Sequence, residues 1–99
     1  MTIGIGLIGF GHWGPNYARV FSELPNATVA CICDASSQRL QAAGKRHRQA
    51  VLTTDVSVLL SNSAVDAVVL ATPAATHNEL TLAALHSGRD CLVEKPLTL

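Results

Sequence analysis

The stretch GFGHWG, residues 9–14, has glycine at its first, third and last positions. The run before it, TIGIGLIG at residues 2–9, is short, apolar and ends in glycine, which predicts a buried strand. Pro15 suits the first turn of a following helix, where a missing N–H leaves no hydrogen bond unmade. Three glycines at this spacing are a weak indication of dinucleotide binding when taken alone, so the surrounding sequence has to decide.

The rest of the chain alternates between short apolar runs and segments with helical spacing. Further strands are predicted at residues 27–33, 50–54, 66–72 and 91–94. Helices are predicted from residue 12 to about 24, from about 36, at 55–60, and from 76 to the glycine at 88. The run DAVVLAT, residues 66–72, shows no alternation, as a central strand of a parallel sheet requires. This order predicts an α/β fold with a Rossmann-type, doubly wound parallel sheet of about five strands.

Two expectations concern packing. The first helix is expected to bury one face, formed by Trp13, Tyr17, Val20, Phe21 and Leu24. Gly4 and Gly6 alternate with larger residues in the first strand, and they are expected to let a helix pack closely against it.

Composition limits the class of protein. The 99 residues are 48% hydrophobic and 14% charged, with a formal net charge of zero, which excludes a disordered chain and favours neither a nucleic acid nor a membrane as partner. No apolar run approaches the roughly 20 residues of a spanning helix, and the start lacks the features of a signal peptide. The three cysteines are expected to be reduced and packed in the core rather than to bind metal, which indicates a cytoplasmic protein.

An acidic residue completes the glycine motif. Asp34 lies twenty positions beyond Gly14, at the end of the second predicted strand. Gly9 would permit the tight turn, Gly11 would let a pyrophosphate approach the backbone, and Gly14 would let the helix pack close to the first strand. Asp34 would accept hydrogen bonds from a ribose diol. The alternative is a turn without a ligand, followed by an acid that only caps the next helix.

Two more loops are predicted at the same edge of the sheet. ATPAATH (71–77) follows the fourth strand and EKP (94–96) follows the fifth, where open α/β sheets bind their ligands. These loops would bring His77, Glu94 and Lys95 close to a bound cofactor. A histidine at the start of a helix or a lone lysine is more often a solvated surface group, and spacing alone does not decide between the two readings.

These motifs, in this order, resemble the N-terminal domain of the Gfo/Idh/MocA oxidoreductases, a family that includes glucose–fructose oxidoreductase and inositol dehydrogenase. The resemblance covers the whole chain, and EKP is its most specific element. It implies an NAD(P)-dependent enzyme that transfers hydride between nicotinamide and a hydroxyl of a sugar, polyol or nucleotide sugar.

The resemblance also implies roles for single residues. The backbone around Phe10, His12 and Trp13 would hold the pyrophosphate. Thr72, Pro73 and His77 would line the path of the cofactor, and Glu94 would lie near the nicotinamide ribose. Lys95 would be the catalytic residue, between nicotinamide and substrate, where it orients and polarises the reacting hydroxyl. Ala74 stands where many members have asparagine, so one hydrogen bond to the cofactor is absent.

The family's substrate pocket, proton-transfer residues and oligomerising sheet belong to a second domain. Residues 1–99 are therefore expected to be the dinucleotide-binding domain of a longer, homo-oligomeric protein, able to bind NAD alone but not to catalyse. NAD is expected over NADP, because Asp34 would repel a 2′-phosphate and Arg39 lies a helical turn further on. Two alternatives are a non-catalytic nucleotide-sensing module and a methyltransferase, neither of which needs Lys95.

Overall fold

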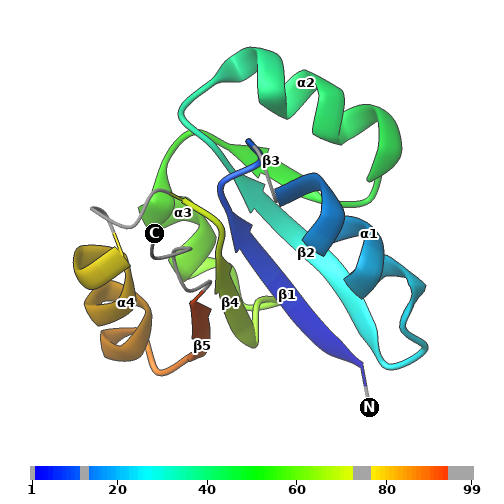
Figure 1. The fold of residues 1–99 in the computed structure, drawn as a ribbon. Coiled ribbons are helices and arrows are strands. Elements are labelled where there is room, and N and C mark those ends of the chain that lie inside the picture. Colours follow the sequence, from blue (N-terminus) through cyan, green and yellow to red (C-terminus); the bar gives the residue numbers. More distant parts are fainter. Residues whose placement is uncertain (1, 12–13, 73–76, 94–99) are drawn as a thin grey trace, which may run out of the picture.

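The chain folds as alternating strands and helices (Figure 1). The computed structural model describes residues 2–11, 14–72 and 77–93. The strands are β1 (Ile3–Ile8), β2 (Ala27–Cys33), β3 (Val51–Thr53), β4 (Ala67–Leu70) and β5 (Asp90–Val93). The helices are α1 (Gly14–Glu23), α2 (Ser37–Arg46), α3 (Val56–Ser61) and α4 (His77–His86). The predicted order of elements is confirmed, and only their ends differ slightly.

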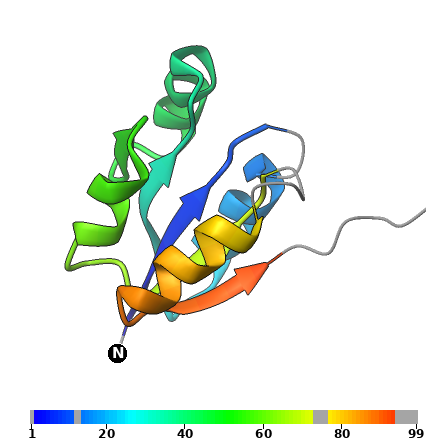
Figure 2. The ribbon, with the colours of Figure 1, turned by 90° about the vertical axis from the view of Figure 1, so that its left-hand side faces the viewer.

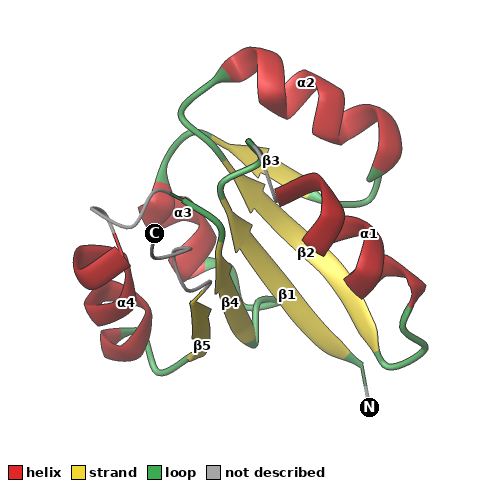
Figure 3. Ribbon diagram, viewed as in Figure 1, coloured by secondary structure: helices red, strands yellow, loops and turns green. Residues whose placement is uncertain are grey.

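The strands form one parallel sheet in the order β3-β2-β1-β4-β5, which confirms the doubly wound arrangement (Figure 3). β1 lies at the centre, where Ile5 is in register with Val29 of β2 on one side and with Ala67 of β4 on the other. The chain first builds outward from β1 to β3, then crosses to β4 and builds the other way. The order therefore reverses between β1 and β4, which is where ligands bind in open sheets of this kind.

Helices cover both faces of the sheet. α1 and α2 lie on one side of it, and α3 and α4 on the other (Figures 1 and 2). The apolar strand residues divide accordingly: Leu7 and Ile32 belong to the core cluster that includes Ala18 of α1, whereas Ile8 and Val68 pack with Leu59 of α3. Burial on both faces explains why these strands read as continuous apolar runs.

The cysteines pack as predicted. Cys31 and Cys33 are buried in the core on the α3 and α4 side, Cys91 is half-buried, and all three are free thiols. Among the described residues, no cluster of histidine, cysteine and acidic side chains could hold a metal ion. No described helix has the length and apolar character needed to cross a membrane.

The predicted buried face of α1 is partly wrong. Val20 is 40% exposed and Leu24, just after the helix, is 46% exposed. The buried residues of α1 are small, Gly14 and Ala18, and Tyr17 and Phe21 pack beside them at the edge of the core. Because Gly14 and Ala18 bring the helix axis close to the sheet, the buried stripe follows residues 14, 17, 18 and 21 and turns Val20 toward solvent. Trp13 lies outside the described residues.

The two glycines of β1 allow close packing on the α3 side. A Cβ on Gly6 would lie 2.9 Å from side-chain atoms of both Leu59 in α3 and Val65, so the helix contact predicted for this residue is confirmed. A Cβ on Gly4 would instead overlap the carbonyl of Ala64, in the loop before β4. Gly4 therefore makes room for backbone rather than for a helix.

Candidate functional site

The turn after β1 is held between the ends of two neighbouring strands. The N–H of Gly9 donates to the carbonyl of Cys33 at the end of β2 (2.7 Å), and the N–H of Ala71 after β4 donates to Ile8 (2.9 Å). Gly9 has a φ of +101°, and a Cβ there would lie 2.7 Å from the carbonyl oxygen of Ala71. Glycine is required here both by the backbone angle and by the neighbouring chain.

The other two glycines of the motif have different surroundings. A Cβ on Gly14 would overlap the carbonyl of Gly9, so the first turn of α1 approaches the residue directly after β1, as predicted. Among the described residues, the atoms nearest to a Cβ on Gly11 belong to the end of the Arg39 side chain, with Nη1 at 3.1 Å. Gly14 is therefore needed for the fold, whereas the missing side chain of Gly11 leaves room above the turn.

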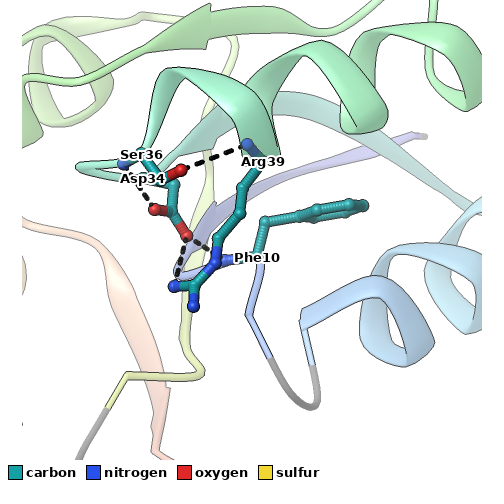
Figure 4. A network of polar contacts seen from close by, with 4 residues as sticks. All are labelled: Phe10, Asp34, Ser36 and Arg39. Atoms are coloured by element: carbon teal, nitrogen blue, oxygen red, sulfur yellow. Dashed lines mark hydrogen bonds and ion pairs between the residues drawn. The ribbon is translucent and has the colours of Figure 1, made fainter.

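Asp34 connects the glycine turn to the start of α2 (Figure 4). Asp34 is only 8% exposed. Its Oδ2 accepts a hydrogen bond from the N–H of Phe10 (2.7 Å), and its Oδ1 accepts one from the N–H of Ser36 (2.8 Å). A carboxylate offers about four acceptor positions, so this one keeps capacity for a diol. Sequence spacing indicated the acid but not its bond to Phe10, 24 residues away.

Phe10 thus serves the site through its backbone and the core through its ring. Phe10 is 6% exposed, and its phenyl ring meets His47, at the end of α2, edge-on with 6.3 Å between ring centroids. Its N–H is engaged by Asp34, so any pyrophosphate contact at this turn falls to the amides that follow Phe10.

Arg39 lies beside Asp34, although the sequence places it a helical turn further on. Its Nη1 is 3.9 Å from Oδ2 of Asp34, and its side chain is 58% exposed (Figure 4). Ser36 caps α2 by accepting the N–H of Arg39 (3.3 Å), which places Arg39 in the first turn. Helical side chains lean toward the N-terminus, so a long one in the first turn reaches back over the helix start.

Of the remaining predicted site residues, only Thr72 and His77 belong to the part of the chain that the structure describes. Thr72 follows β4 at the same edge as the glycine turn, with its Cγ2 3.0 Å from the position a Cβ of Gly9 would take. His77 is the first residue of α4. His12, Trp13, Pro73, Glu94 and Lys95 lie outside the described residues, as do Ala74 and Thr76, and their roles stay predictions.

The site holds no reactive thiol. Cys33 is the residue before Asp34, and burial, followed by the negative charges of Cys31, Asp34 and Asp55, raises its pKa to about 11. A thiol with that pKa is protonated at neutral pH and is a poor nucleophile.

This geometry fits one class of ligand. Gly9 and Gly14 keep the turn close to its neighbours, and Gly11 leaves room above it. A helix begins at Gly14, and the first N–H groups of a helix have no partner within it. A buried carboxylate lies at the end of the next strand. Helix N-termini favour phosphate, and a carboxylate in this place favours a ribose diol. Together these groups suit the pyrophosphate and adenosine ribose of a dinucleotide.

Comparison with known proteins also indicates an NAD-binding fold. The Gfo/Idh/MocA model, described as "Oxidoreductase family, NAD-binding Rossmann fold", matches residues 3–99. Inositol 2-dehydrogenase 4 from Saccharopolyspora erythraea is 38% identical over 95 residues, which cover 95% of this chain and 28% of that protein.

Two solved structures have closely similar folds. The first is scyllo-inositol dehydrogenase from Lactobacillus casei with bound NAD(H) and scyllo-inositol, with a TM-score of 0.90 and 25% identity over 100% of this chain and 29% of the other. The second is a 3-ketoreductase from Actinomadura kijaniata, solved as a variant with TDP-benzene and NADP, with a TM-score of 0.88 and 28% identity over 99% of this chain and 31% of the other.

The chain spans less than a third of the length of these relatives. The matched region contains the glycine turn, Asp34 and the strand-order reversal. The chain thus belongs to the Gfo/Idh/MocA family of oxidoreductases, and it provides that family's NAD-binding Rossmann fold.

Proposed function

We propose that this chain is the cofactor-binding domain of an NAD-dependent dehydrogenase that oxidises a hydroxyl of a sugar, polyol or nucleotide sugar. The observation that carries this proposal is the buried carboxylate of Asp34, hydrogen-bonded to the glycine turn and placed beside the strand-order reversal. NAD, when bound, supplies the hydride acceptor. The chain's own residues bind and orient it.

We assign the adenosine ribose to Asp34 and the pyrophosphate to the turn between Gly9 and Gly14, with the amides of His12 and Trp13 as donors. Thr72, Pro73 and His77 would lead toward the nicotinamide, with Glu94 at its ribose. Lys95 would hold the substrate hydroxyl and polarise it. In support, Thr72 lies at the same edge of the sheet as the glycine turn.

The substrate class follows from the relatives, which include inositol and D-apiose dehydrogenases. Because those proteins are more than three times as long as the matched region, we propose that residues 1–99 act together with a second, substrate-binding domain. We further propose that the protein is cytoplasmic, consistent with free thiols and with no described membrane-spanning helix. We also propose that it is a homo-oligomer, as the family resemblance implies.

Calorimetric titration of the 99-residue chain with NAD tests the binding assignment. Asp34→Asn keeps the size of the side chain and removes its charge, so NAD affinity should fall about tenfold or more as charge-assisted hydrogen bonds to the ribose are lost. Asp66→Asn is the matched control, because Asp66 also accepts a backbone N–H (Gly4, 2.8 Å) but lies at the opposite ends of the strands. Equal losses in both variants would contradict the assignment.

NADH formation with a panel of polyols and nucleotide sugars tests the enzymatic assignment. We expect the 99-residue chain to bind NAD without turnover, because a lysine at its reference pKa of about 10.4 is a poor base and the family's proton-transfer residues belong to a second domain. Turnover that is lost in Lys95→Ala would show that the domain is catalytically self-sufficient. Turnover unaffected by Lys95→Ala would remove the catalytic role of that residue.

A further inference from the structure

A cavity lies far from Asp34, at the opposite edge of the sheet. Its volume is about 360 Å³. It is formed where α1 and α2 end and β2 begins, and its lining residues are Ser22, Ala27, Thr28, Val29, Lys45, Arg46, His47, Arg48, Gln49 and Ala50. Thr28 and Asp34 lie near opposite ends of β2, which at about 3.3 Å per residue separates them by roughly 20 Å. The C-terminal ends of α1 and α2 are on the right in Figure 3.

Positive charge is concentrated at this cavity. Lys45, Arg46 and Arg48 are three of the seven lysines and arginines in a chain of zero net charge. No acidic residue is among the described residues that line it. None of the three cations forms an ion pair with any residue that the structure describes, whereas Arg19 and Arg39 each lie within 4.0 Å of a carboxylate oxygen.

Helix stabilisation accounts for only part of this charge. Lys45 and Arg46 are in the last turn of α2, where cations favour the negative end of the helix. Each helix end carries about half a negative charge, so α1 and α2 together offset about one of the three positive charges. Arg48 lies beyond α2 and gains little from its dipole. An excess of positive charge therefore remains around a hollow surface, where it attracts anions.

We propose that this cavity is a binding site for a small phosphorylated molecule, held by Lys45, Arg46 and Arg48. Arginine matches the geometry of a phosphate group with two parallel hydrogen bonds. The volume is at the lower end of the range for small-molecule sites, about 300–1,000 Å³. The hydroxyl of Thr28 and the amide of Gln49, both in the lining, can bind the rest of the ligand. The concave shape and the zero net charge favour a small molecule over nucleic acid.

The test must separate this cavity from the dinucleotide turn, since a helix N-terminus also attracts phosphate. Chemical shifts of the ¹⁵N-labelled 99-residue chain are recorded with NAD at saturation while inorganic phosphate, and in a second series pyrophosphate, is added at constant ionic strength. We expect saturable shifts at residues 27–29 and 45–50. The double variant Arg46→Gln/Arg48→Gln should bind pyrophosphate with an affinity at least about tenfold lower, because two charge-assisted contacts are lost.

Arg19→Gln is the matched control, since Arg19 is an exposed arginine of α1 that does not line the cavity. It should bind pyrophosphate like the unmodified chain. Thermal unfolding of each variant tests whether the fold is retained. The proposal is overturned by shifts that do not saturate or that lie elsewhere, or by equal affinity in the double variant and the control. Tighter binding of a short DNA duplex than of pyrophosphate would overturn the assignment to a small molecule.

Discussion

The guanidinium of Arg39 lies 3.9 Å from the carboxylate of Asp34, measured from Nη1 to Oδ2. The carboxylate is buried and fixed by two backbone N–H groups, whereas the guanidinium is largely exposed. The negative charge that would repel a 2′-phosphate therefore has a solvent-exposed positive charge beside it. Cofactor choice in this chain depends on both residues.

We predict that NAD binds more tightly than NADP and that Arg39 reduces this difference in affinity. Arg39→Gln should weaken NADP binding about fivefold and leave NAD nearly unchanged, because a solvent-exposed ion pair contributes about 1 kcal/mol or less. Asp34→Asn should act in the opposite direction and reduce the preference for NAD. Calorimetric titration with both dinucleotides measures the two ratios. Equal or tighter binding of NADP by the unmodified chain would contradict this prediction.

Gly11 and Gly14 should respond differently to substitution, although they belong to the same motif. Of the described residues, Gly11→Val displaces the flexible end of Arg39, so the melting temperature should change little while NAD binding is abolished. Gly14→Ala forces a Cβ into the carbonyl of Gly9, which is backbone and cannot yield easily, and it should destabilise the fold by about 1–3 kcal/mol or more. Urea unfolding and NAD titration of both variants separate the two effects. Normal NAD binding by Gly11→Val would show that pyrophosphate does not cross the turn at Gly11.

The fold was predictable because its determinants are local. Strands that are apolar on both faces alternate with helical segments, and that order leaves few arrangements other than a parallel sheet with helices on both sides. The roles of Gly9 and Gly14 in the turn and the start of the helix were predictable for the same reason, although the contact of Gly9 with Ala71 was not. The exposed Val20 was not, because periodicity defines an apolar stripe but not how far small residues such as Gly14 and Ala18 rotate it.

Contacts between distant segments could not be read from the sequence. The bond from Phe10 to Asp34 depends on how β1 and β2 align, and the position of Arg39 depends on the direction of a side chain at the start of α2. The basic run at residues 45–48 is plain in the sequence, but the cavity beside it exists only once α1, α2 and β2 are assembled.

Stability should fall on mild acidification because of His47. Burial, and then the positive charge of Arg46, lowers the pKa of His47 below its ordinary 6.5. The unfolded chain therefore takes up a proton near pH 6.5 that the folded chain does not, so this part of the stability is present above pH 6.5 and is lost as the pH falls below it.

Urea unfolding at pH 7.5 and at pH 5.5 measures this effect. The free energy of unfolding should drop more between these values in the unmodified chain than in His47→Gln, which has no group to protonate at that position. The same drop in both proteins would assign the pH dependence to other groups. The buffers should contain no phosphate, because His47 lines the basic cavity.

The thiols should differ in reactivity according to their burial. Cys31 is fully buried and Cys33 is 2% exposed, and burial raises the pKa of each to about 11. At pH 8 only about one such thiol in a thousand is ionised, and access is closed as well. Cys91, at the edge strand β5, is half-buried; burial raises its pKa too, while a hydrogen bond with Thr81 opposes the shift.

In the folded chain we therefore expect a disulfide reagent to modify Cys91 first and Cys31 and Cys33 only on the timescale of unfolding. Cys91→Ser should abolish the early phase, and urea should make all remaining thiols react at once. Rapid modification of two thiols in the folded Cys91→Ser variant would mean that β2 is exposed in solution and that the core on the α3 and α4 side is not closed.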